Sequence, residues 1–156
     1  MEMHWRYLIK IWCRSRPFRR RFMDKLLLHL REALCKKDAE AIEYLIDEND
    51  FSKDCVVFVE ILCQLLEENW HIKHEDIALI LQEAKDARAI EALYNTAQKK
   101  LDYLDYDDTC QLSRKCIWAL WQIGTEEAVE KIKLLAESND KVIGNYAIKQ
   151  LNRVKN

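Results

Sequence analysis

The scarcity of glycine and proline constrains this chain more than any other feature. Among its 156 residues the only glycines are Gly124 and Gly144, and the only proline is Pro17. Sheet folds need turn residues about every 8–12 residues, and phosphate-binding loops need clustered glycines. The sequence therefore excludes hairpin-rich β folds, dinucleotide-binding folds and P-loop enzymes. It predicts one all-α domain, long enough to hold a core without metal or disulfide bonds.

The cysteines indicate the compartment. The six are Cys13, Cys35, Cys55, Cys63, Cys110 and Cys116. They are scattered through apolar stretches without the spacing of a disulfide framework, which favours a reducing cytoplasm. No apolar run reaches the roughly 18 residues that span a bilayer, and the first residues lack a signal-peptide pattern. We therefore expect a cytoplasmic protein.

Charge is divided unevenly along the chain. The net charge is −2, but residues 1–22 carry seven basic side chains and one acidic one, so residues 23–156 sum to −8. This asymmetry predicts a basic leader, 1–22, followed by an acidic body, 23–156, with Pro17 between the two.

The leader allows three interpretations. Its apolar residues Trp5, Leu8, Ile9 and Trp12 form one stripe on a short helix. A basic amphipathic helix of this kind contacts anionic membranes or nucleic acid. Alternatively it covers the exposed end of a helical array, or Met23 is the true start of the protein.

The body is predicted to be helical throughout. Apolar spacing predicts helices over 24–36, 38–48, 53–69, 73–84, 86–100, 110–123, 125–137 and 140–153. Asp24, Asp38, Ser52, Thr109 and Asn139 or Asp140 are the candidate N-cap residues. The helix over 53–69 is apolar nearly all round and should be the most buried.

The body also repeats. Segment 38–45 matches 86–93 at six of eight positions at an offset of 48, and the pattern recurs over 125–132 at a further 39. A second helix type recurs between 116–123 and 144–151 at an offset of 28. These offsets predict units of two helices that pack pair against pair.

One motif in the stretch 112–130 consists of Arg114, Ala119, Leu120, Ile123, Gly124, Ala128 and Val129. At these positions the stretch resembles a HEAT-like repeat of the phycobilisome-lyase type. The match is specific over 112–137, fair over 80–97 and 140–154, and weak before residue 70, and Trp121 replaces the usual small residue. The resemblance implies a right-handed, armadillo-like α-solenoid of antiparallel helix pairs, with about eight helices plus the basic N-terminal helix. Such folds mostly serve as interaction surfaces.

An acidic, tyrosine-containing insertion is the main candidate binding site. The offsets 39 and 28 differ by 11 residues, which indicates an insertion of that length just before the helix at 110–123. Insertions in repeat proteins often lie on the binding face. The predicted contact residues for a positively charged protein are Tyr103, Asp105, Tyr106, Asp107 and Asp108. The alternative is a solvated loop whose tyrosines fold back as a local lid.

Two tryptophans lie one turn apart on the helix at 110–123. Tryptophan at helical spacing is usually part of a core, so Trp118 is predicted to be buried. Trp121 remains open, and we count it among the partner-binding residues because an exposed tryptophan is a good interface anchor.

Metal binding and catalysis have little support. Cys63, Glu67, His71 and His74 fall within twelve residues, and His74-Glu75 resembles the dyads of HEAT-like metal oxygenases. Those enzymes need several dyads, however, and a closed site needs four converging ligands. We therefore predict no metal, no cofactor and no catalytic residue.

These features predict a monomeric, non-enzymatic module that binds a basic protein. The narrower hypothesis is a bacterial immunity or antitoxin-like protein that occludes a basic toxin, such as a nuclease domain. One rival is a HEAT-like lyase or glycosylase acting on a tetrapyrrole or DNA, although DNA binding disagrees with a body charge of −8. The other is a peripheral membrane adaptor anchored by the leader.

Overall fold

The structure, a computed structural model, describes residues 16–52 and 54–154. Regular structure in this part is entirely helical, which confirms the all-α prediction. The α-helices are α2 (Arg16–Lys36), α3 (Ala39–Glu48), α4 (Cys55–Glu67), α5 (His74–Ala84), α6 (Ile90–Thr96), α7 (Gln111–Ile123), α8 (Glu126–Ala136) and α9 (Lys141–Val154). Two short 3-10 helices, η1 (Ala87–Ala89) and η2 (Asp102–Leu104), precede α6 and α7.

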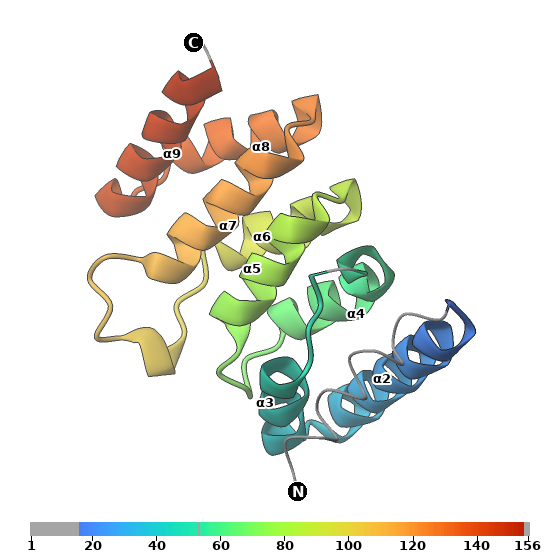
Figure 1. Cartoon of the computed structure of the whole chain (residues 1–156). Coiled ribbons are helices and arrows are strands. Elements are labelled where there is room, and N and C mark those ends of the chain that lie inside the picture. The colour runs from blue at the N-terminus through green and yellow to red at the C-terminus, as the bar shows by residue number, and fades with distance from the viewer. Residues whose placement is uncertain (1–15, 53, 155–156) are drawn as a thin grey trace, which may run out of the picture.

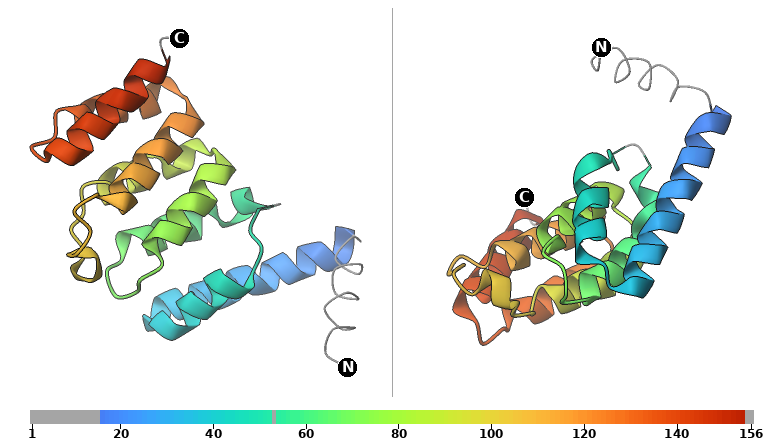
Figure 2. Two further views of the ribbon diagram at one scale, coloured as in Figure 1. Left: turned by 60° about the vertical axis from the view of Figure 1, so that its left-hand side comes forward. Right: turned by 90° about the horizontal axis from the view of Figure 1, so that it is seen from below.

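From α4 onward the helices form two layers (Figure 1). Helices α5, α7 and α9 lie side by side in one layer, and α4, α6 and α8 lie in the other. Consecutive helices pack across the layers, as α4 does on α5, α6 on α7 and α8 on α9. At the opposite end from α9, α2 packs on α3 and α4 (Figure 2). The segment between α6 and α7 is a long excursion at one edge of the layers.

The first helix begins earlier than predicted. Helix α2 runs unbroken from Arg16 to Lys36, so Asp24 is not an N-cap and the expected boundary after residue 22 falls inside a helix. Pro17 lies in the first turn, where the missing N–H of proline breaks no intrahelical hydrogen bond. The apolar stripe predicted over residues 5–12 lies outside the described residues.

Two of the other predicted N-caps are correct and two are wrong. Asp38 and Asp140 accept hydrogen bonds from N–H groups in the first turns of α3 and α9. Ser52 does not cap α4, because that helix begins at its third following residue. At α7 the carboxylate of Asp107, rather than Thr109, accepts the first N–H of the helix at 2.6 Å.

Helix α4 is buried along most of its length, as predicted. Leu62, Leu65 and Leu66 have no exposed surface. Its first turn differs from the prediction, because Val56 and Val57 are each 48% exposed. Fully burying a leucine side chain contributes about 1.5–3 kcal/mol, so this helix is the centre of the hydrophobic core.

Only part of the predicted repeat is a repeat of packed helix pairs. The offsets of 39 and 28 relate α6 to α8 and α7 to α9, and each related pair lies within one layer. The offset of 48 instead relates α3 to α6, so one period contains the three helices α3, α4 and α5 and cannot be a two-helix unit. Segments 38–45 and 86–93 are alike because each opens with an aspartate cap and continues as an amphipathic turn.

Gln150 on α9 gives a prediction about stability. It is fully buried, and its Nε2 has no hydrogen-bond partner within the described residues, while its Oε1 accepts a long 3.4 Å bond from Arg153. An unsatisfied buried donor costs about 1–3 kcal/mol. Gln150→Met should therefore raise the free energy of unfolding by about 1 kcal/mol in urea titration. Gln64→Met, at an exposed position of α4, is the control, and destabilisation by Gln150→Met would contradict the prediction.

Candidate interaction groove

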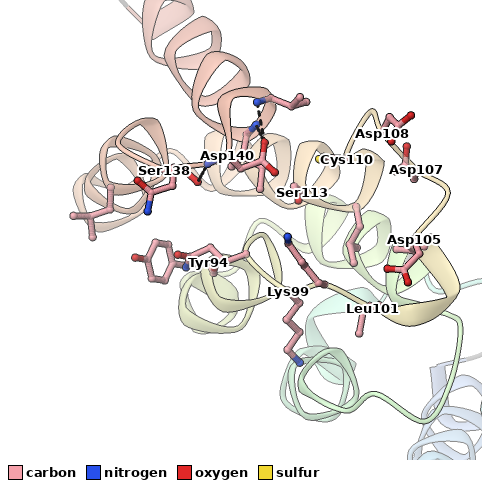
Figure 3. A pocket seen from close by; sticks show the side chains of 18 of the residues that line it. Tyr94, Lys99, Leu101, Asp105, Asp107, Asp108, Cys110, Ser113, Ser138 and Asp140 are labelled. Atoms are coloured by element: carbon pink, nitrogen blue, oxygen red, sulfur yellow. Dashed lines mark hydrogen bonds between the residues drawn. The ribbon is translucent and has the colours of Figure 1, made fainter.

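A cavity of about 740 Å³ opens between the segment 99–110 and the turn that joins α8 to α9 (Figure 3). Its walls come from the end of α6, the first turn of α7, the end of α8 and the start of α9. Leu101, Leu112 and Ile143 line it with buried apolar side chains. Because several carboxylates also line it, we call this cavity the acidic groove.

Carboxylates dominate the polar lining of the acidic groove. They are Asp105, Asp107, Asp108, Glu137 and Asp140. Asp107 and Asp140 are engaged in capping α7 and α9. The other three carboxylates form no ion pair or side-chain hydrogen bond within residues 16–52 and 54–154. The groove therefore presents three uncompensated negative charges around an apolar lining.

The lysines of the groove do not neutralise these carboxylates. Lys99 points away from them (Figure 3), and its Nζ donates to the carbonyl oxygens of Leu66, at 3.1 Å, and of Glu67 at the end of α4. Burial lowers the pKa of Lys99 below its ordinary value. Lys100 forms no ion pair with the described part of the chain and is exposed.

The predicted contact patch divides in the structure. Asp105, Asp107 and Asp108 line the acidic groove. Tyr103 does not, because it folds back against the core, which matches the alternative interpretation of a local lid for this one tyrosine only. Tyr106 is 82% exposed and lies outside the groove lining.

Tyr103 ties the inserted segment to α5. Its hydroxyl lies 3.0 Å from Nδ1 of His74, and the two rings are tilted with centroids 5.7 Å apart. Burial is the main reason that the pKa of Tyr103 rises to about 12. The phenol therefore stays protonated and donates to the imidazole near neutral pH.

Glu137 and Asp140 are groove residues that the sequence analysis did not identify. Both belong to the turn between α8 and α9, more than 25 positions beyond the inserted segment. Asp140 was recognised as a cap, but its place in the groove depends on α9 packing beside α7. A sequence signal was available for both residues. In two layers of antiparallel helices, turns that are two helices apart lie on the same edge, so charged residues in the turn between α8 and α9 are expected near the segment between α6 and α7.

Both tryptophans of α7 are half-buried, but in different surroundings. Along α7 the residues that avoid the core are Gln111, Arg114, Lys115, Trp118 and Gln122, which share one helical stripe. Trp118 is therefore partly exposed, contrary to prediction. Trp121 packs against the hydrophobic core and lies outside the acidic groove, so the structure does not bring it together with the acidic residues.

Two buried histidines close the carboxyl end of α4. The rings of His71 and His74 stack with centroids 4.3 Å apart. Their Nε2 atoms lie 2.8 Å from the carbonyl oxygen of Leu65 and 2.7 Å from that of Glu68. A carbonyl oxygen only accepts, so both Nε2 atoms carry the proton. Nδ1 of His71 accepts from the N–H of Lys73, and both imidazoles are held neutral.

This geometry leaves the histidines no lone pair for a metal. Burial is the main cause that lowers the pKa of both, that of His74 to about 4. Cys63 contacts the carbonyl oxygen of Arg88 at 3.9 Å, and burial raises its pKa to about 11. Within the described residues no group of three His, Cys, Asp or Glu side chains could hold a metal ion.

Comparisons with protein-family models, with curated proteins and with solved structures found no match. In the part of the chain that the structure describes, every helix is too short or too polar to cross a bilayer. The five cysteines in that part carry free thiols.

Proposed function

We propose that this chain is a non-enzymatic binding module that holds a basic segment of a partner protein in the acidic groove. The observation that carries the proposal is the set of three unpaired carboxylates, Asp105, Asp108 and Glu137, around one apolar lining. Unpaired surface charges of one sign steer a partner of the opposite sign and select against others.

The composition of the groove suits lysine and arginine side chains in particular. Such side chains bury their methylene stems on apolar surface and keep the charged group in a polar rim. Leu101 and Ile143 offer the apolar surface, and the carboxylates of Asp105 and Glu137 lie around it. Ser113 and Ser138 add hydroxyl groups to the lining.

We further propose that the architecture is a HEAT-like α-solenoid. Support comes from the two layers of helices. It also comes from the sequence offsets of 39 and 28, which relate α6 to α8 and α7 to α9 within those layers. In such an array the inter-helix segments collect along an edge, which is where the acidic groove lies. The narrower proposal is an immunity or antitoxin-like protein that occludes a basic toxin domain; a small acidic body with a net charge of −8 supports it.

The test uses a charge-reversal variant of the groove. Asp105→Lys, Asp108→Lys and Glu137→Lys are combined in one variant, and the full chain is titrated against a fluorescein-labelled lysine–leucine peptide in 50 mM salt. Each exposed charge pair contributes about 0.2–1 kcal/mol, and reversing three charges also replaces attraction with repulsion of similar size. The variant should therefore bind about tenfold more weakly.

The control makes the same charge change elsewhere. It combines Glu32→Lys, Glu48→Lys and Glu83→Lys, which are exposed positions on α2, α3 and α5. We expect this control to bind the peptide within about threefold of the parent chain. Equal weakening in both variants would mean that net charge, and not the acidic groove, controls binding.

A further inference from the structure

A second charged surface, of opposite sign to the acidic groove, covers the exposed sides of α7 and α9. These helices lie side by side in one layer (Figure 1). We call the surface the α7–α9 face and define it by Arg114, Lys115, Trp118, Tyr146, Lys149 and Arg153. It contains two shallow hollows, one lined by Arg114, Tyr146 and Lys149 and the other by Arg114, Trp118 and Tyr146.

Aromatic rings and guanidinium groups alternate across this face. The guanidinium carbon of Arg114 lies 4.8 Å from the ring centroid of Tyr146. That of Arg153 lies 5.2 Å from the ring of Trp118, which in turn lies 4.9 Å from Trp121. The two pairs of a guanidinium and a ring join α7 to α9, so the two helices together build a row of flat groups.

Nearby carboxylates compensate the cations of the α7–α9 face only in part, and the charge of Arg114 also lowers the pKa of Asp107. Lys115 is paired with Glu75 at 2.5 Å. Arg114, Lys149 and Arg153 form no ion pair within residues 16–52 and 54–154, although Asp108 borders the hollow next to Arg114 and Lys149. The face therefore carries a local positive charge on a body whose total charge is negative.

From this arrangement we infer that the α7–α9 face binds single-stranded nucleic acid, RNA or DNA. Single strands are bound by a basic surface that follows the phosphates and by aromatic or guanidinium planes on which unpaired bases stack. Lys149 and Arg153 would contact phosphates, and bases would extend the stacks of Arg114 on Tyr146 and of Arg153 on Trp118. A duplex does not fit as well, because its bases are already stacked on one another. The α7–α9 face meets the acidic groove at Asp108, which lines both, but the inference does not depend on the proposed groove function.

The experiment measures fluorescence anisotropy of labelled (dT)20 and U20 with the full chain between 50 and 200 mM salt. The two phosphate contacts proposed for Lys149 and Arg153 predict a slope of log K against log salt of about −1.4. Lys149→Glu should weaken binding at least tenfold, because it replaces an exposed cation, which forms no ion pair within the described residues, with an anion. Lys25→Glu, the same change on the exposed side of α2, should have less than a twofold effect. The two oligonucleotides show whether the sugar matters.

A second variant separates stacking from charge. Arg114→Lys keeps the positive charge but removes the flat guanidinium from the ring of Tyr146. It should weaken binding about threefold to tenfold and leave the salt slope unchanged. Circular dichroism melting checks that each variant is folded.

Several results would overturn the inference. One is that neither oligonucleotide binds at 50 mM salt. A second is that Lys25→Glu weakens binding as much as Lys149→Glu, which would place the site near the basic start of α2. A third is that Arg114→Lys has no effect. A fourth is that polyglutamate at equal charge displaces the oligonucleotides, since an acidic polypeptide would then fit the face as well.

Discussion

Lowering the pH from 7 to 4.5 is expected to reduce the free energy of unfolding by about 2.5 kcal/mol through His74 alone. Burial lowers the pKa of His74 from 6.5 in the unfolded chain to about 4 in the fold. Between these two values the unfolded state binds more protons than the folded state, so stability falls as the pH falls. His71, whose pKa is also lowered by burial, acts in the same direction.

Urea unfolding measured at intervals from pH 7 to 4.5 tests this prediction. His74→Gln should flatten the pH dependence, because a glutamine amide can still donate to the carbonyl of Glu68 but does not titrate in this range. His29→Gln, at an exposed position of α2, should leave the pH dependence as it is. The pKa values of Asp86 and Asp107 are lowered, so protonation of these carboxylates reduces stability mainly below pH 4.5, outside the range measured. If His74→Gln loses stability with acid as steeply as the parent chain, the histidine is not responsible.

Lys99→Met is expected to lower the free energy of unfolding by about 2 kcal/mol at pH 7. The last carbonyl groups of a helix have no partners within it, and Lys99 donates to two of them, those of Leu66 and Glu67. Thr96 also donates to the carbonyl of Leu66, at 3.2 Å, so the variant leaves mainly Glu67 without a partner. Hydrogen bonds from a charged donor contribute more than neutral ones, which sets the size of the effect.

The adjacent residue provides the matched control. Lys100 is exposed, whereas Lys99 is partly buried, and both line the acidic groove. Lys100→Met should change the stability by less than about 0.5 kcal/mol. The difference between the two variants should persist in 1 M salt, because partly buried interactions are poorly screened. Equal effects of the two substitutions would show that Lys99 does not stabilise the end of α4.

Both predictions concern the way the inserted segment is attached to the body. Lys99 and Tyr103 lie in the chain on either side of Leu101, and both bond groups near the carboxyl end of α4. Asp105 and Asp108 follow directly along the chain. Weakening these attachments should therefore also loosen the wall of the acidic groove, and peptide binding measured with Lys99→Met can show it.

Local patterns predicted the helices well because their causes are local. Apolar spacing located eight helical stretches, and a short polar side chain with free backbone N–H groups identified the caps at Asp38 and Asp140. The prediction placed the start of the first helix too late because it took Asp24 as the N-cap and assigned Pro17 to a separate leader. Proline is compatible with a first helical turn.

The candidate site was predicted only in part, for a physical reason. The acidic segment was recognised from its composition, but Tyr103 left the predicted patch because a histidine on α5 accepts its hydrogen bond. Glu137 joined the site because α9 packs beside α7. Net charge was equally uninformative about the α7–α9 face, where Arg114 and Arg153 gather on a body that is acidic overall.

Hydrophobic periodicity and the near absence of glycine and proline were enough to specify an all-helical chain, because backbone conformation follows from neighbouring residues. The same local patterns were not enough to specify the contacts of Lys99, His74 and Trp118, because their partners lie on helices distant in the chain. Only the packing of α9 beside α7 within one layer decided which carboxylates share a groove and which cations share a face.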